Sequence, residues 1–100
     1  MEVSFAGATL RRCYESLAEA RKRWGDKIGR VYVRRIDLLY AAKCARDLYG
    51  FPQLSLHPLD GDRKGQYAIS LDGFWRLIVT FANTGQTTVK VEEVSKHYDD

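Results

Sequence analysis

The side chains that could do chemistry gather in one stretch of the chain, LHPLDGDRKGQYAISLDGFWRL, which begins at Leu56. This stretch holds His57, and the only other histidine is His97, near the end of the chain. An imidazole titrates near neutral pH, so either histidine is suited to moving a proton in catalysis. A histidine in an arbitrary domain more often has a structural role, and both interpretations stay open.

Arg76 follows Trp75 in an apolar segment whose alternation predicts a β-strand. Successive side chains of a strand point to opposite faces, so Arg76 leaves the sheet on the face opposite to Trp75. A guanidinium held by a strand is able to bind a phosphate group through its planar array of donors. An ion pair with Asp60, Asp62 or Asp72 fits the same position, and the spacing does not decide between the two roles.

Between His57 and Arg76 lies the turn Asp62-Arg63-Lys64-Gly65, with two cations at its tip. Such a turn suits contact with a phosphodiester backbone, and it equally suits an ordinary solvated turn. Tyr67 and Tyr98 carry rings that are able to stack on nucleobases. Trp75 has the same ring chemistry, but its position favours a place in the core.

Several reaction classes find no support in the sequence. It has no glycine-rich phosphate loop, no Cys/His set with metal-ligand spacing and no serine nucleophile elbow. We therefore expect acid and base catalysis without a metal or another cofactor. RNA carries its own nucleophile, since a deprotonated 2′-hydroxyl attacks the adjacent phosphate and leaves a cyclic phosphate and a free 5′-hydroxyl. That reaction needs a base, an acid and a cation at the phosphorane, which His57, His97 and Arg76 would supply.

Size and composition predict one small domain that spans residues 1–100, because 100 residues with 45% hydrophobic content suffice for one core. No apolar run is long enough to cross a bilayer, and the first residues do not resemble a secretion signal. We therefore expect a soluble cytoplasmic protein. Cys13 and Cys44 lie far apart in helical patterns, which predicts reduced, buried thiols.

Charge is distributed unevenly along the chain. Residues 1–50 hold eleven Lys/Arg against six Asp/Glu, whereas residues 51–100 hold five against seven. A basic half favours contact with a polyanion such as RNA or with an acidic protein segment, although many helices carry such a face only for solubility. The arginines that would make such a contact are Arg11, Arg12, Arg30, Arg34 and Arg35.

The apolar periodicity predicts the elements that position these side chains. A short strand comes first, an α-helical hairpin follows, and the last three of four further strands form an antiparallel meander. The fold class is therefore α+β, with a curved antiparallel sheet whose one face is packed on the helices. The expected bounds are Glu2–Phe5 for the first strand, Ala8–Trp24 and Asp26 to about Tyr49 for the helices, and Leu54–His57, Gln66–Leu71, Trp75–Ala82 and Thr87–Val94 for the later strands.

The stretch LHPLDGDRKGQYAIS, the following WRL and the acidic last strand that ends in histidine resemble HigB toxins of the RelE/ParE superfamily of toxin–antitoxin systems. The segment GDKIGRVYVRRIDLLYAA resembles a subgroup with longer helices, sometimes labelled killer or killer-suppression proteins. The resemblance implies a single RelE-like domain. It also implies a microbial endoribonuclease that cuts messenger RNA in the ribosomal A site, neutralised by a helix-turn-helix antitoxin that resembles HigA. His57, Arg76 and His97 match the family's site residues.

The chain departs from the family pattern near this site. Asp60 stands where HigB toxins have a lysine after His-Pro-Leu, and Asp72 stands near a position that is basic in some of them. HigB toxins end in an Asp-Tyr-His motif, and this chain has Ser-Lys-His at the matching position. Lys96 would thus restore a cation, and Tyr98 follows the histidine.

Two functions remain open on this scaffold. The first is ribosome-dependent cleavage of messenger RNA. The second is non-catalytic binding, either as a gyrase inhibitor of the ParE kind or as an attenuated toxin that acts through its antitoxin in repression, because the fold alone does not separate these functions.

Overall fold

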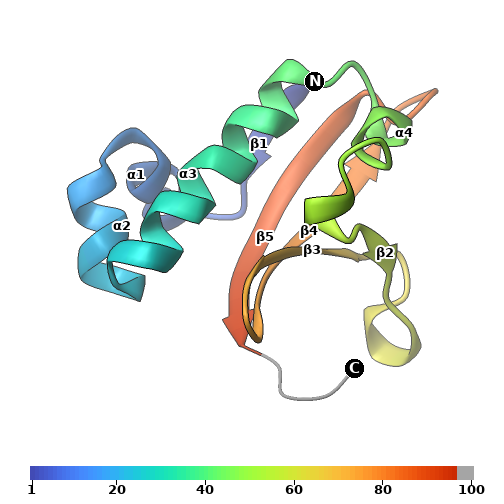
Figure 1. The fold of residues 1–100 in the computed structure, drawn as a ribbon. Helices are drawn as coiled ribbons and strands as arrows, with labels where there is room; N and C mark the ends of the chain where they lie inside the picture. Colours follow the sequence, from blue (N-terminus) through green and yellow to red (C-terminus); the bar gives the residue numbers. More distant parts are fainter. Residues whose placement is uncertain (97–100) are drawn as a thin grey trace.

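In the described part of the chain, five strands form one sheet in the order β1-β5-β4-β3-β2, and the helices α1 to α3 lie together beside it (Figure 1). This computed structural model describes residues 1–96. The helices are α1 (Ala8–Glu15), α2 (Leu17–Trp24), α3 (Asp26–Ala41) and α4 (Ala45–Leu48), with the 3₁₀ helices η1 (Pro52–Leu54) and η2 (Gly61–Arg63). The strands are β1 (Glu2–Phe5), β2 (His57–Pro58), β3 (Tyr67–Asp72), β4 (Trp75–Ala82) and β5 (Thr88–Lys96).

The predicted meander is confirmed, since β3, β4 and β5 pair antiparallel in chain order. The first strand, β1, pairs parallel with β5, with Val3 opposite Val89, so the complete sheet is mixed. A parallel neighbour needs a long connection, and the helices together with β2, β3 and β4 supply it. The register shifts between Ser70 and Asp72 in β3 and beside Ile78 in the β4–β5 pair. Such irregularities bend and twist strands, which accounts for the predicted curvature.

The predicted first helix, Ala8–Trp24, is interrupted at Ser16, and this expectation was wrong at that point. Ser16 has an extended backbone (φ −136°, ψ 110°) and ends α1, and its hydroxyl accepts a hydrogen bond of 3.3 Å from the backbone N–H of Glu19 at the start of α2. Serine is a favoured N-cap because its side chain satisfies one of the donors that a helix start leaves without a partner. A second helix start therefore replaces a continuous helix.

The second predicted helix, expected to end near Tyr49, also divides in two. α3 ends at Ala41, and the extended backbone of Ala42 separates it from the short α4. Gly25 occupies the N-cap position of α3, with a φ of +87° that favours glycine. Asp26 is the first helical residue and binds the guanidinium of Arg30 one turn later.

The predicted strand Leu54–His57 is mostly not a strand. Proline starts η1, because its fixed φ suits a first helical turn, and Ser55 ends η1 in a left-handed conformation (φ +46°). After η1, this segment pairs with β3 only through His57 and Pro58, and His57 lies opposite Ala68. The strand beside the site is thus two residues long.

The core lies between α3 and one face of the sheet, as the helical periodicity predicted. Ile36 and Leu39 of α3 are fully buried, together with Leu77 and Val79 of β4. The Tyr32 ring is also fully buried, its hydroxyl donates a 2.7 Å hydrogen bond to the carbonyl of Leu10, and burial raises the pKa of this phenol. The sheet face turned away from α3 therefore carries the side chains of the candidate site.

The thiols only partly follow the prediction. Cys13 is buried, Cys44 is half-buried, and neither forms a disulfide. No helix within residues 1–96 is long and apolar enough to cross a membrane.

Candidate functional site

Pairing of β2, β3 and β4 brings His57 and Arg76 together from positions nineteen residues apart. Arg76 lies opposite Ser70 in β3, and His57 lies opposite Ala68 two residues earlier. Ala68, Ser70 and Arg76 share one sheet face, because side chains alternate along each strand. Nη1 of Arg76 lies 3.4 Å from Nε2 of His57, and both side chains are half-buried.

The ring of His57 is oriented by the backbone that precedes it. Nδ1 lies 2.9 Å from the carbonyl oxygen of Ser55. A carbonyl only accepts hydrogen bonds, so Nδ1 carries the proton in this contact and Nε2 of the neutral ring offers a lone pair. That lone pair faces the guanidinium of Arg76. The arrangement presents a proton acceptor and a permanent cation side by side.

A pocket of about 250 Å³ opens around these two side chains. Small residues keep it open, because a larger side chain at Ala68, Ser70 or Gly73 would fill it. Gly73 has a φ of +56°, which suits the tight β3–β4 turn at the edge of the pocket. The lining residues are Ser55, His57, Ala68, Ser70, Gly73, Trp75 and Arg76.

Trp75 joins the pocket to the core and to a further cation. Its ring is half-buried and packs against the core cluster, as its position in the sequence indicated. The ammonium of Lys96 lies 5.7 Å from the centroid of this ring, and the two residues are opposite each other in β4 and β5. Lys96 is therefore exposed at the end of the sheet that holds the pocket.

The structure does not bring Tyr67 to the pocket. Tyr67 lies on the helix-covered face of the sheet, where its ring packs edge-on against Phe81 with centroids 5.1 Å apart. The cations of the predicted turn lie elsewhere on the site face. Arg63 donates to Glu93 at 2.5 Å, and Glu93 lies opposite Ile78 in the register. Lys64, which ends η2, is exposed.

The carboxylates near the site have definite places. Asp72, which was one candidate partner of Arg76, forms an ion pair of 3.5 Å with Lys27 of α3. Asp60 is exposed at the start of η2 and, within residues 1–96, forms no ion pair. The carboxylate that neutralises Arg63 is thus Glu93, which the sequence did not single out because a bulge in β5 obscures its alternation.

Arg35 is a correction to the predicted basic helix face. Its Nε donates a 2.9 Å hydrogen bond to the carbonyl of Ser70, whose side chain lines the pocket. Burial, and to a smaller extent the neighbouring Arg34, lowers the pKa of this guanidinium. Arg35 therefore ties α3 to the strand under the pocket and is half-buried, unlike the exposed arginines of the helices.

The other four arginines of that face, Arg11, Arg12, Arg30 and Arg34, are exposed. The guanidinium of Arg11 lies 5.1 Å from the centroid of the Phe5 ring. His97 and Tyr98, the remaining predicted site residues, lie outside the described residues.

Comparison with known proteins places the fold among bacterial toxins. A YoeB/ParE toxin from Agrobacterium tumefaciens superposes with a TM-score of 0.58 at 20% sequence identity, over 98% of this chain and 100% of that one. YafQ from E. coli strain BL21(DE3) superposes with a TM-score of 0.65 at 17% identity, over 96% of this chain and 92% of YafQ. A chain of a YoeB–YefM complex from Staphylococcus aureus superposes with a TM-score of 0.55 at 16% identity, over 98% of both chains. At these identities the likeness concerns the fold alone.

The sequence adds the family. The family model of the HigB-like toxin, described as the RelE-like toxin of the type II toxin–antitoxin system HigB, matches residues 3–93. The chain therefore belongs to the HigB-like family of RelE-like toxins. None of the curated proteins compared with the chain matches it.

Proposed function

We propose that this toxin is an endoribonuclease that cleaves messenger RNA on the ribosome by metal-free acid and base catalysis. The observation that carries the proposal is the contact of His57 Nε2 with Arg76 Nη1 inside a small-walled pocket of a HigB-like domain. A proton acceptor beside a fixed cation is the pair that attack of a 2′-hydroxyl on a phosphate requires.

His57 is assigned the role of general base. The Ser55 carbonyl favours the proton on Nδ1, so Nε2 accepts the proton of the 2′-hydroxyl once the bound phosphate draws the Arg76 guanidinium away from it. The resulting alkoxide attacks the adjacent phosphorus, and the guanidinium of Arg76 stabilises the additional negative charge of the phosphorane. His97 is assigned the role of general acid, which donates a proton to the departing 5′-oxygen. The products are a 2′,3′-cyclic phosphate and a 5′-hydroxyl.

Contacts outside the pocket would hold the RNA. Lys96 at the end of the sheet and Lys64 in the β2–β3 connection are exposed and would bind message phosphates, with Arg63 next to Lys64 and Tyr98 stacking on a base. Arg11, Arg12, Arg30 and Arg34 would contact ribosomal RNA, since phosphate contacts give affinity without a sequence requirement. The place of action would then be the ribosomal A site in the cytoplasm.

The proposed protein partner is a helix-turn-helix antitoxin of the HigA kind, encoded beside the toxin. Membership in the HigB-like family supports an antitoxin, and one of the similar structures is itself a YoeB–YefM complex. Co-expression tests this partner. Growth arrest caused by the toxin alone should be relieved when a helix-turn-helix protein encoded beside it is co-expressed. Arrest that persists in the presence of this protein contradicts the assignment.

A second candidate, a non-catalytic toxin of the same fold, is favoured by the charges around the pocket. Glu93 neutralises Arg63, and Asp60 is exposed where the family resemblance leads one to expect a lysine. Both reduce the positive charge available to a message. Gyrase inhibition, or repression together with an antitoxin, would then be the activity.

Cell-free translation separates the two candidates. Purified toxin is added to a translation reaction, and message ends are mapped by primer extension with and without ribosomes. Cuts that require ribosomes and disappear in Arg76→Ala support the nuclease. The matched control is Arg46→Ala, an exposed arginine of α4 that does not line the pocket and should cut like the wild type. Intact message in the presence of folded wild-type protein would favour the non-catalytic toxin. A supercoiling assay would then test whether the protein inhibits gyrase.

A further inference from the structure

A second pocket lies between α1 and α2, apart from the residues that line the His57–Arg76 pocket. Its volume is about 300 Å³, at the lower end of the range of small-molecule sites, which is roughly 300–1,000 Å³. In Figure 1, α1 and α2 lie on the opposite side of the molecule from β2, which carries His57. A ligand bound here would not touch the atoms assigned to RNA cleavage. The lining residues are Thr9, Arg12, Cys13, Glu19, Lys22 and Arg23.

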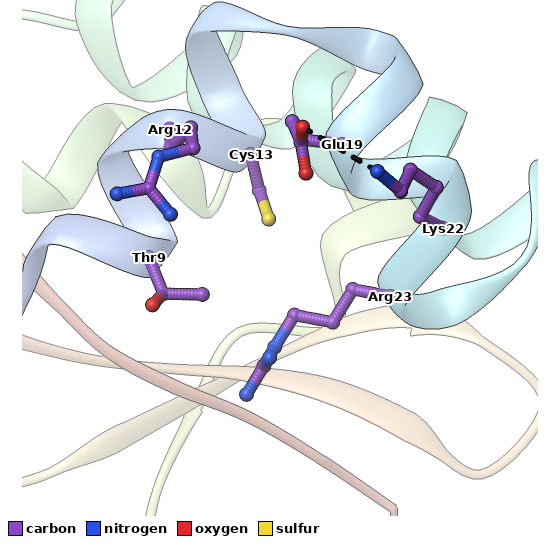
Figure 2. A pocket seen from close by; sticks show the side chains of 6 residues that line it. All are labelled: Thr9, Arg12, Cys13, Glu19, Lys22 and Arg23. Atoms are coloured by element: carbon purple, nitrogen blue, oxygen red, sulfur yellow. Dashed lines mark ion pairs between the residues drawn. The ribbon is translucent and has the colours of Figure 1, made fainter.

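Figure 2 shows how these side chains surround the open space. Arg12 and Thr9 of α1 lie on one side, Arg23 of α2 extends along the other, and the Cys13 sulfur points between them. Burial raises the pKa of the Cys13 thiol, while the charges of Arg23 and Arg12 act in the opposite direction. The thiol therefore stays protonated at neutral pH, and the floor of the pocket carries no negative charge.

Ion pairs within residues 1–96 neutralise only part of the positive charge of the pocket. Lys22 forms a loose ion pair of 3.8 Å with Glu19, drawn as a dashed line in Figure 2. None of the ion pairs found within residues 1–96 includes Arg12 or Arg23. Arg21, on the same helix, is by contrast paired with Asp26 at 2.8 Å. Cations that face a common cavity repel one another, and an anion between them relieves that repulsion.

The donor set indicates which anion fits. Two guanidinium groups offer planar arrays of N–H donors that match phosphate oxygens, and the Thr9 hydroxyl adds a neutral donor. Three cations and one carboxylate leave two positive charges in excess. A phosphate monoester carries about −1.5 to −2 at pH 7 and matches this excess. A carboxylate or an internal phosphodiester carries a single charge and matches it less well.

We propose that the pocket between α1 and α2 binds the terminal phosphate group of a phosphate monoester or polyphosphate. Such a ligand has two possible sources, a free nucleotide and the phosphorylated end of an RNA. Binding at this site requires neither ribosomes nor the His57–Arg76 pocket, although Arg12 is also one of the arginines proposed to contact ribosomal RNA. It offers the toxin a place where a phosphorylated small molecule or RNA end is sensed away from the cleavage site.

An NMR titration with inorganic pyrophosphate at constant ionic strength tests the site. We expect saturable changes in amide shifts confined to residues 9–23, a readout that needs no variant. Arg12→Gln and Arg23→Gln should each weaken binding by about tenfold or more, because each removes charge-assisted hydrogen bonds. Arg46→Gln makes the same charge change on exposed α4 and should leave the affinity within about twofold of the wild type. Absence of saturation, or equal weakening in Arg46→Gln, overturns the proposal.

Two competitors then distinguish the source. Adenosine triphosphate represents the free nucleotide, and a short single-stranded RNA with a 5′-phosphate represents an RNA end. The same RNA with a 5′-hydroxyl should displace pyrophosphate at least about tenfold less effectively than the phosphorylated one, because it lacks a doubly charged group. Equal displacement by both RNAs would show that the pocket reads internal phosphodiesters and would refute the preference for a terminal phosphate.

Discussion

Removing the His57 and Arg76 side chains together should lower the cleavage rate little more than removing the more important of the two. Nη1 of Arg76 lies 3.4 Å from Nε2 of His57, so both groups would act on one phosphate at the same time. Loss of a general base typically costs about 10²–10⁴ in rate. Loss of one donor to a developing anion costs about 10²–10³, or roughly 3–4 kcal/mol.

If the two groups acted independently, the double variant would lose about 10⁴–10⁷ in rate, the product of the single losses. Groups that form one catalytic unit are strongly non-additive, because the second removal affects a step that the first has already disabled. We expect His57→Ala/Arg76→Ala to lie within about tenfold of the slower single variant.

The assay is single-turnover cleavage of a message on stalled ribosomes, with each variant in excess over ribosomes. Thermal melts of the same preparations serve as the control for folding. Both side chains are half-buried and outside the main core. We therefore expect each substitution to lower the free energy of unfolding by about 1 kcal/mol at most, which corresponds to a fall in Tm of at most about 4–8 °C. Multiplicative losses in the double variant would refute the shared site, and near-wild-type cleavage by Arg76→Ala would refute its role at the phosphorane.

Three further predictions concern the scaffold and the surroundings of the pocket. A Cβ at Gly29 would lie 3.0 Å from the backbone carbon of Ala20, so Gly29→Ala should separate α2 from α3. The cost of overpacking, about 1–3 kcal/mol, exceeds the gain of about 1 kcal/mol in helix propensity. Denaturant titration should therefore show a lower free energy of unfolding for Gly29→Ala. A more stable variant would contradict the close approach of the two helices. The hydrogen bond to Asp37 raises the pKa of Tyr14 to about 12, so this contribution to stability is complete below about pH 10 and is lost as pH rises through the folded-state value. Thermal melts from pH 9 to 12 should fall less steeply for Tyr14→Phe, and an unchanged slope would contradict the effect. If Asp60 is an adaptation of this toxin, Asp60→Lys should leave ribosome-dependent cleavage unchanged, while a large gain in the same assay would identify the natural chain as attenuated.

Local sequence signals were sufficient for much of the fold. The alternation in residues 67–96 and the turn residues between the strands predicted the antiparallel meander, because a two-residue period leaves one face apolar. The same reasoning placed Arg76 opposite to Trp75. The apolar periodicity also predicted that the helices pack on one face of the sheet, and Tyr32 and Ile36 of α3 are fully buried there. These features depend on residues close together in the sequence, and for that reason the sequence predicted them.

The boundaries were less predictable, because competing local interactions decide them. Ser16 fits a helical pattern by spacing, yet its hydroxyl satisfies a backbone donor and starts a new helix. Pro52 and the left-handed Ser55 convert an apparent strand into a 3₁₀ helix and a two-residue strand. In each case the periodicity was present, and capping or backbone geometry outweighed it.

The sequence by itself determined the kinds of side chain at the site and the face of the sheet on which Arg76 lies, since these follow from residue type and from strand alternation. Only the tertiary structure decided that Nε2 of His57 meets Arg76, that Ser55 fixes the ring, and that Arg35 supports the strand beneath. It also decided that Tyr67 packs on the other face. These contacts depend on strand register and on the approach of α3 to β3, and both are set by packing between distant segments.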